Sequence, residues 1–99
     1  MKLTGKERKL LRGLAHKFIP QVYIGKNELT EGSIVSINQS LDSKELIKIK
    51  FFDNNCKKNS INTIQKKLSC NVVGDIGKIL ILYRQHIDPD KRKYLLNKD

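Results

Sequence analysis

The amino-acid sequence predicts a single α/β domain in which three helices pack on a four-stranded mixed sheet. Segments with the helical period of apolar residues alternate with segments of strand character, in the order α-β-α-β-α-β-β. The chain has 99 residues, of which 38% are hydrophobic, enough for one core and too few for two. We expect residues 1–84 to form the domain. Residues 85–99 are expected to be a loosely ordered tail, because their charges are mixed and Pro89 interrupts regular structure.

The first helix is expected over residues 4–17. Glu7 follows Thr4 at the spacing of a capping box, which marks a helix start. Three apolar residues recur at i, i+4 and i+8 and predict the stripe that faces the core: Leu10, Leu14 and Phe18. Four basic residues fall mostly off this stripe and are expected to be exposed: Lys6, Lys9, Arg12 and Lys17.

Pro20 ends this helical stretch, because proline disfavours the α conformation in the residue before it. Residues 21–24 follow as a short strand, and residues 25–28 form a tight connection. Thr30 is then expected to cap a second helix over residues 30–43. Its apolar positions follow the spacing i, i+3 and i+7: Ile34, Ile37 and Leu41.

The clearest strand covers residues 46–51, where apolar residues alternate with Lys48 and Lys50. A turn at residues 53–55 precedes a third amphipathic helix, whose apolar stripe is Ile61, Ile64 and Leu68. Residues 71–73 and 78–84 then predict two neighbouring strands with a short connection, as in a hairpin. The second of these strands is uniformly apolar in its middle, so we expect it to be central and buried on both faces.

Positive charge dominates the chain, with 20 Lys and Arg against 10 Asp and Glu, a net charge of +10. Residues 1–27 carry seven basic residues and one acidic residue, and residues 56–84 carry six and one, around a mildly acidic middle. This distribution predicts a folded domain with one basic face and a polyanionic partner, either nucleic acid or an anionic membrane surface. A generally solvated lysine surface is the alternative.

Other classes of function are not supported. The longest uncharged apolar run is far shorter than the about 20 residues that cross a bilayer, and charges interrupt every N-terminal apolar stretch. We therefore expect a cytoplasmic protein in which Cys56 and Cys70 are reduced thiols. His16 and His86 are the two histidines, and no catalytic set or metal-ligand cluster is recognisable. We expect no enzyme activity, no cofactor and no metal.

Several ordered blocks make the chain similar to a known family. They are Gly13-Leu14-Ala15-His16, Pro20 and Val22 before Gly25-Lys26-Asn27, Leu29-Thr30-Glu31-Gly32, residues 45–50, Ile76-Gly77-Lys78 and Leu82-Tyr83-Arg84. Residues 3–84 thereby resemble the CRM (chloroplast RNA splicing and ribosome maturation) family, in particular its stand-alone bacterial YhbY-like members. The resemblance implies the same order of elements, RNA binding as the activity, and association with precursors of the large ribosomal subunit. We expect a monomer that binds ribosomal RNA.

The signature of that family is a G-x-x-G loop between the first strand and the second helix, and it maps onto Gly25-Lys26-Asn27-Glu28. In KH domains a comparable loop approaches the sugar-phosphate chain closely, because glycine has no Cβ and helix N-terminal N–H groups face the anion. In this chain Glu28 replaces the second glycine and brings a negative side chain to the rim. A second G-x-x-G, at residues 74–77, is interpreted as the connection between two strands.

The leading hypothesis is an RNA-binding protein that neutralises ribosomal RNA phosphates with cations of the first helix, the loop and the second strand. The candidate RNA-binding residues are Lys6, Lys9, Arg12, His16, Lys17, Gly25, Lys26, Asn27, Thr30, Lys48, Lys50 and Arg84. The alternative hypothesis is a protein-interaction module, whose acidic middle and apolar edge dock a partner and whose positive charge serves solubility.

Three aromatic or imidazole side chains have two interpretations each. His16 either faces RNA or packs locally at the end of the first helix. Tyr23 and Tyr83 either stack on bases or belong to the core, as strand tyrosines more often do.

Overall fold

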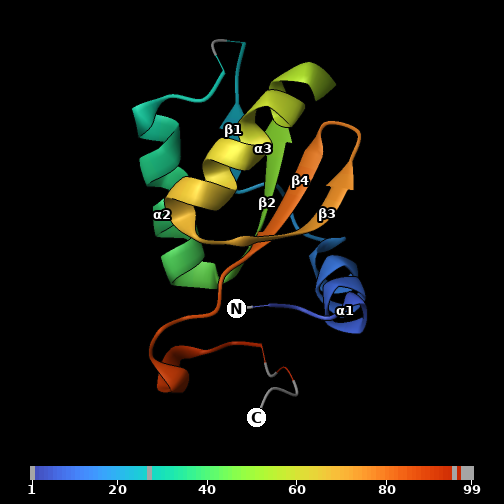
Figure 1. Cartoon of the computed structure of the whole chain (residues 1–99), viewed down its shortest axis with the longest axis vertical. Coiled ribbons are helices and arrows are strands. Elements are labelled where there is room, and N and C mark those ends of the chain that lie inside the picture. The colour runs from blue at the N-terminus through green and yellow to red at the C-terminus, as the bar shows by residue number, and fades with distance from the viewer. Residues whose placement is uncertain (1, 27, 95, 97–99) are drawn as a thin grey trace.

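A computed structural model describes residues 2–26, 28–94 and 96 of the chain. Within these residues three α-helices and one four-stranded mixed sheet follow each other in the predicted order (Figure 1). The strands are β1 (Val22–Ile24), β2 (Leu46–Phe51), β3 (Asn71–Ile76) and β4 (Ile79–Tyr83). The order in the sheet is β1-β2-β4-β3, with β1 parallel to β2 and both other pairs antiparallel. The predicted fold class is confirmed.

The helices are α1 (Gly5–Ala15), α2 (Glu31–Lys44) and α3 (Asn54–Leu68). Figure 1 shows α2 and α3 on one face of the sheet and α1 on the other, near the end from which β2 starts. Each interface has its own core of buried apolar side chains, one against α2 and α3 and one against α1. The expectation that the chain is too short for two cores is therefore wrong, because a sheet that is covered on both faces buries one cluster on each face. None of the helices in the described part of the chain has the length and apolar character of a membrane-spanning segment.

Strand β4 lies between β2 and β3, as its uniformly apolar sequence predicts. Successive side chains of a strand point to opposite faces. Leu80 and Leu82 therefore pack against α2 and α3, whereas Ile81 and Tyr83 pack on the side of α1. Burial on both faces is confirmed.

Strand β3 is longer than the predicted residues 71–73, because it continues to Ile76 and leaves Gly77 and Lys78 as the turn to β4. The register with β4 shifts by one residue at Val73, which forms a β-bulge. The prediction ended the strand at Gly74 because glycine usually punctuates strands. A bulge is the other setting in which a strand accommodates glycine.

The two glycines of the second G-x-x-G have separate structural reasons. A Cβ added to Gly74 would lie 2.9 Å from Ile81 Cδ1, so the bulged strand packs too closely for a side chain there. Gly77 has φ +55°, a left-handed conformation that favours glycine, at the turn. Neither glycine needs a ligand to explain it.

Helix α1 begins as predicted and ends earlier, at Ala15 instead of residue 17. The capping box is present: the Glu7 backbone N–H donates to Thr4 Oγ1 at 3.1 Å, and the Thr4 N–H donates to Glu7 Oε1 at 2.8 Å. His16 is the C-terminal cap.

The predicted apolar stripe of this helix is wrong at Leu10 and Leu14 and right at Phe18, which is partly buried against the core on this side of the sheet. Leu11 and Ala15 are fully buried, whereas Leu10 is 52% and Leu14 is 46% exposed. Because leucine occupies both position 10 and position 11, the sequence permits a stripe through Leu10 and Leu14 or one through Leu11 and Ala15. The stripe that contains the small Ala15 faces the sheet, where a small residue permits close packing.

The other two helices also differ slightly from prediction at their ends. Thr30 caps α2 as expected, and the helix continues one residue past the predicted end, to Lys44. The predicted turn at residues 53–55 is instead the start of α3, where Asp53 is the N-cap and its Oδ1 accepts from the Cys56 N–H at 2.8 Å.

The chain after β4 packs back on the α1 side of the domain. Tyr94 meets Tyr83 edge to face, with ring centroids 6.3 Å apart, and Leu96 joins the same core. Pro89 does not exclude regular structure, because it starts a short 3₁₀ turn, Pro89–Lys91, at the position where a missing N–H costs nothing.

Candidate nucleic-acid interface

The outer face of α1 carries two of the predicted cations, Lys6 and Lys9. Both are exposed, and together with Leu10, Gly13 and Leu14 they line a shallow depression on the helix. Neither makes an ion pair with any described residue. Their charges are therefore available to an anion from outside.

The two arginines of α1 instead hold the helix to the sheet. Arg8 Nη1 donates to the Val72 carbonyl at 2.7 Å, and Arg12 Nη1 donates to the Val73 carbonyl at 3.3 Å. Both carbonyls lie at the bulge of β3, an edge strand with backbone acceptors that the sheet does not use. Arg12 was predicted to bind RNA, and its guanidinium already has this partner. Arg8 was not singled out, and the one sequence signal for the bulge that it binds is Gly74 within β3.

Lys48 closes the C-terminal end of α1. Its Nζ donates to the carbonyls of His16 at 3.0 Å and Phe18 at 3.2 Å, at the end of the helix where carbonyls lack intrahelical partners. A cation there also complements the helix dipole. Lys48 thus brings the exposed His16 and Lys17 beside β2.

Beyond the end of α1, the same face of the sheet is open. Lys50 projects on the side of Leu46 and Lys48, because side chains two apart in a strand share a face. It stands in register with Tyr23 of β1, which is 64% exposed. Tyr83, in contrast, is fully buried, so its interpretation as a core residue is confirmed.

The loop after β1 is closed by the Glu28 N–H, which donates to the Gly25 carbonyl at 3.1 Å. Glu28 has φ +64°, in the left-handed region that favours glycine. A Cβ at Gly25 would meet nothing within 4 Å, and this glycine does not have a left-handed φ. The backbone conformation therefore favours glycine at position 28 and does not require glycine at position 25. Lys26 is exposed, and the predicted Asn27 lies outside the described residues.

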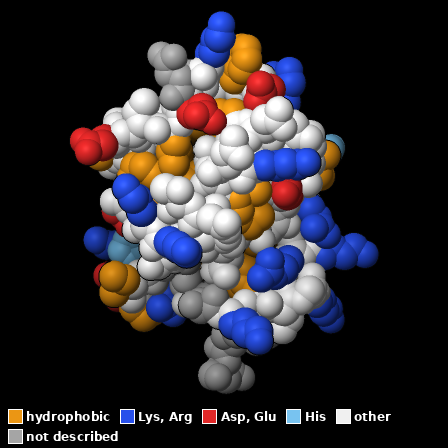
Figure 2. Space-filling view, turned by 45° about the horizontal axis from the view of Figure 1, so that its top comes forward, with side chains coloured by type: hydrophobic (Ala, Val, Ile, Leu, Met, Phe, Trp, Pro, Cys, Tyr) orange, Lys and Arg blue, Asp and Glu red, His pale blue; other side chains and the backbone are white. Residues whose placement is uncertain are grey.

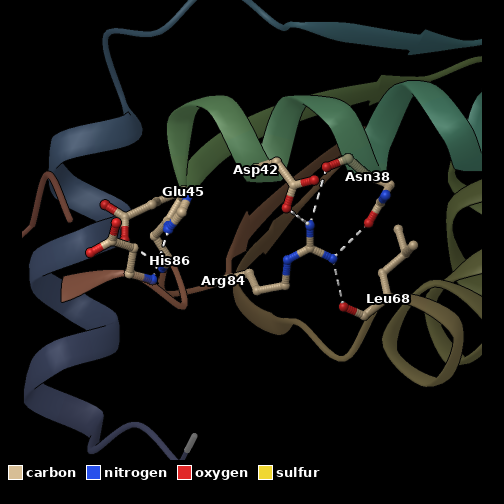
Figure 3. Close-up of polar contacts among 7 residues, drawn as sticks. Asn38, Asp42, Glu45, Leu68, Arg84 and His86 are labelled. Atoms are coloured by element: carbon tan, nitrogen blue, oxygen red, sulfur yellow. Dashed lines mark hydrogen bonds and ion pairs between the residues drawn. The ribbon is translucent and has the colours of Figure 1, made fainter. Parts of the chain in front are cut away.

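Two further predicted residues, Thr30 and Arg84, form hydrogen bonds within the protein. Thr30 Oγ1 accepts from the Ser33 N–H at 3.1 Å at the start of α2. The Arg84 guanidinium lies between α2 and the end of α3, where it donates to Asn38 Oδ1 and the Leu68 carbonyl at 2.9 Å and to Asp42 Oδ1 at 2.8 Å (Figure 3). The structure does not bring Arg84 together with the cations of α1.

Five of the predicted cations remain exposed and unpaired among the described residues, and we call them the basic surface: Lys6, Lys9, Lys17, Lys26 and Lys50. They extend from the outer face of α1, past its C-terminal end, across β2 to the loop after β1. In the space-filling view Lys and Arg side chains are most crowded on the right-hand and lower side (Figure 2). No three His, Cys, Asp or Glu side chains of the described residues gather as metal ligands.

A family model described as the CRS1 / YhbY (CRM) domain matches residues 3–84. The chain belongs to the CRM family. A Haemophilus influenzae protein named "RNA-binding protein" is 42% identical over 84 residues, covering 83% of this chain and 85% of that protein. "Probable RNA-binding protein YqeI" of Bacillus subtilis is 33% identical over 86 residues, covering 84% and 88%. The solution structure of the hypothetical protein SAV1595 from Staphylococcus aureus has a TM-score of 0.78 at 32% identity, covering 93% of this chain and 98% of that one.

Membership in the CRM family confirms the resemblance predicted from the sequence. The G-x-x-G loop that the resemblance implies would have its second glycine at position 28, where the backbone is left-handed. In this CRM domain a glutamate adopts that left-handed conformation. A non-glycine residue in that conformation costs roughly 1 kcal/mol.

Glu45, which no sequence pattern marks as functional, holds the chain after β4 at the end of this CRM domain that lies away from the loop after β1. Glu45, 1% exposed and with φ +63°, ends α2. Its carboxylate accepts from the backbone N–H of His86 at 2.7 Å (Figure 3). It also accepts from the backbone N–H of Lys93. Its partners are distant in sequence, so no local pattern indicates them.

Proposed function

We propose that this protein binds RNA mainly through the phosphate backbone, using the basic surface, and that it performs no catalytic step of its own. The observation that carries this proposal is the set of five exposed lysines without acidic partners, in a family whose relatives are named as RNA-binding proteins. We further propose that the RNA is ribosomal and that the protein acts on precursors of the large ribosomal subunit. This finer step is supported by the resemblance to YhbY-like proteins.

Release of counterions favours the binding of lysine side chains to RNA. A lysine that neutralises a phosphate releases cations condensed on the RNA, so affinity falls as salt concentration rises. An unpaired lysine loses no internal ion pair when it binds, whereas Arg84 would have to leave Asp42. The basic surface spans a helix, a sheet and a loop, which suits recognition of RNA shape more than of base sequence.

A salt titration tests the electrostatic mechanism. With the five lysines of the basic surface on phosphates, the plot of log Kobs against log salt concentration should have a slope of about −4 on structured RNA. A flat plot, together with salt-insensitive capture of a protein partner, would favour the protein-interaction alternative instead.

A charge-reversal pair locates the interface. The combination of Lys9→Glu, Lys26→Glu and Lys50→Glu should abolish RNA binding at moderate salt. The matched control has the same change in charge on α3, across the sheet: Lys58→Glu, Lys66→Glu and Lys67→Glu. It should retain most of the affinity. Equal losses in both triples would mean that net charge, and not this surface, drives binding.

The ribosomal part has a separate test. Cells that carry a tagged copy are fractionated on sucrose gradients after RNA crosslinking, and the crosslinked RNA is sequenced. The expected result is tagged protein in the fractions of large-subunit precursors, crosslinked to their ribosomal RNA. Recovery outside ribosomal fractions, on other RNA, would contradict the ribosomal assignment and leave RNA binding in place.

A further inference from the structure

Helix α1 covers only part of the sheet face on which it packs. The rest of that face carries a row of four side chains, one from each strand. Tyr23 of β1 is in register with Lys50 of β2, Lys50 with Ile79 of β4, and Ile79 with Ile76 of β3. Side chains in register on adjacent strands are direct neighbours on one face. The row therefore crosses the whole sheet, and we call it the sheet row: Tyr23, Lys50, Ile79 and Ile76.

Three residues of the sheet row, Tyr23, Lys50 and Ile76, lie outside the core that α1 covers. On this face the core beneath α1 contains Leu46, Ile81 and Tyr83, which are nearer to the start of β2, and Ile79 packs at the edge of that core. Tyr23 is 64% and Ile76 is 63% exposed, and Ile79 is partly exposed between them. Sheet faces that stay in water are normally polar, so exposed apolar and aromatic side chains in register indicate a surface for binding.

Charge decides what kind of partner fits. Lys50 stands within the row without an acidic partner among the described residues. Lys26 follows β1 and Lys78 lies in the turn between β3 and β4, at the end of the sheet drawn uppermost in Figure 1. The neighbouring acid of β3, Asp75, pairs with Lys57 of α3 and so belongs to the opposite face. A partner in which a flat apolar group is linked to a negative charge would complement these apolar and cationic side chains.

We propose that the sheet row binds unpaired nucleotides of single-stranded RNA. The ring of Tyr23 stacks on one base, the ammonium of Lys50 contacts the adjoining phosphate, and the side chains of Ile79 and Ile76 cover the face of the next base. This proposal rests on the proposed RNA binding and adds to it that the bound RNA includes unpaired bases. Stacking tolerates any base, so no sequence specificity is required.

Fluorescence offers a direct readout, because the chain contains no tryptophan. In the Tyr23→Trp variant the indole is the single tryptophan fluorophore, and a stacked base quenches its emission. Titration with a single-stranded RNA 12-mer of mixed sequence should quench the emission. The same 12-mer annealed to its complement should leave the emission nearly unchanged while it still binds to the basic surface.

Affinity measurements on single-stranded RNA give the second readout. Tyr23→Ala should weaken binding by about 5-fold or more, since a lost base stack has that magnitude. Tyr23→Phe, which keeps the ring, should bind like the unmodified protein. The matched control is Val35→Ala on α2, which also shortens a half-exposed apolar side chain, on the other side of the sheet, and should have no effect.

The outcomes separate this proposal from the proposed function. Salt-dependent RNA binding without quenching, and with Tyr23→Ala equal to Tyr23→Phe, would overturn the stacking proposal and leave phosphate binding in place. Equal quenching by single-stranded and duplex RNA would also overturn it. Absence of binding to any RNA would overturn both. Circular dichroism of each variant verifies the fold, because Tyr23 is exposed and its replacement is not expected to unfold the domain.

Discussion

The backbone N–H of His86 donates a hydrogen bond of 2.7 Å to the carboxylate of Glu45, which is buried at the end of α2. The same carboxylate accepts from the N–H of Lys93. Two points of the chain after β4 are thus held by one side chain. A buried acid that receives two backbone donors is satisfied in the way that buried charge requires.

Replacement of Glu45 should release this part of the chain. Glu45→Ala leaves two N–H groups without their acceptor, which costs about 1–3 kcal/mol of stability. Amide hydrogen exchange at His86 and Lys93 should accelerate, and the melting temperature should fall. Glu31→Ala, which removes an exposed carboxylate from the same helix, is the control and should leave both amides protected. Unchanged exchange at the two amides in Glu45→Ala would show that the carboxylate does not hold them.

Replacement of Glu28 should separate conformation from charge in the loop. Glu28→Gly suits the left-handed φ of +64° and should raise stability by about 1 kcal/mol. It also removes a negative charge beside Lys26 and should tighten RNA binding. Glu28→Gln removes the charge and keeps the unfavourable conformation, so it should tighten binding without the gain in stability. If neither variant changes affinity, the loop is only a turn.

The glycines allow a graded test of packing by alanine. Gly74→Ala places a Cβ 2.9 Å from Ile81 Cδ1 and should destabilise the domain by about 1–3 kcal/mol. Gly77→Ala keeps space around it but has φ +55°, at a cost of about 1–2 kcal/mol. Gly25→Ala should be neutral or slightly stabilising, because its site is open and its backbone is not left-handed. Urea unfolding of the three variants gives the order, and a Gly25→Ala variant as unstable as Gly74→Ala would contradict it.

Stability should decline at alkaline pH. Burial raises the pKa of Tyr83 from its usual 10.0 to about 12 and the pKa of Cys70 from 9.0 to about 11. The folded state therefore holds these protons more tightly than the unfolded chain does. Their contribution to stability is complete below about pH 9 and is lost as pH rises through 11 for Cys70 and through 12 for Tyr83. Urea unfolding between pH 8 and 11 measures this decline.

Tyr83→Phe should reduce that alkaline decline without harm at neutral pH. The Tyr83 hydroxyl is buried and has no hydrogen-bond partner among the described residues, so its removal does not break a bond. Removal of an unsatisfied polar group is neutral or stabilising. A loss of more than about 1 kcal/mol at pH 7 would indicate that the hydroxyl has a partner after all.

The parts of the fold that could be predicted from the sequence are those governed by neighbours in the chain. The alternation of apolar residues with Lys48 and Lys50 predicts β2 with its observed bounds, and Thr4 with Glu7 predicts the capping box. In both cases the interacting groups are a few residues apart, so the pattern contains the whole cause.

Features that depend on distant partners could not be predicted in this way. Arg84 looks like any surface cation in sequence, yet its partners Asn38 and Asp42 come from another helix. Lys48 likewise binds carbonyls at the end of α1. Leu10 and Leu14 were placed on the buried side of α1 for the same reason, because the sheet selects the face that contains Ala15. In the candidate site, the presence of exposed lysines could be predicted from the composition. The sequence alone does not distinguish these lysines from the cations that are hydrogen-bonded within the protein.

The central place of β4 has a consequence during synthesis of the chain. Both cores draw on this strand, through Leu80 and Leu82 on one face and Ile81 and Tyr83 on the other. A nascent polypeptide that has not yet emerged as far as Tyr83 can complete neither of them, and β2 and β3 lack the strand that joins them. The domain therefore folds only after nearly all of it has left the ribosome. Products of premature termination before residue 79 remain unfolded and are open to proteolysis.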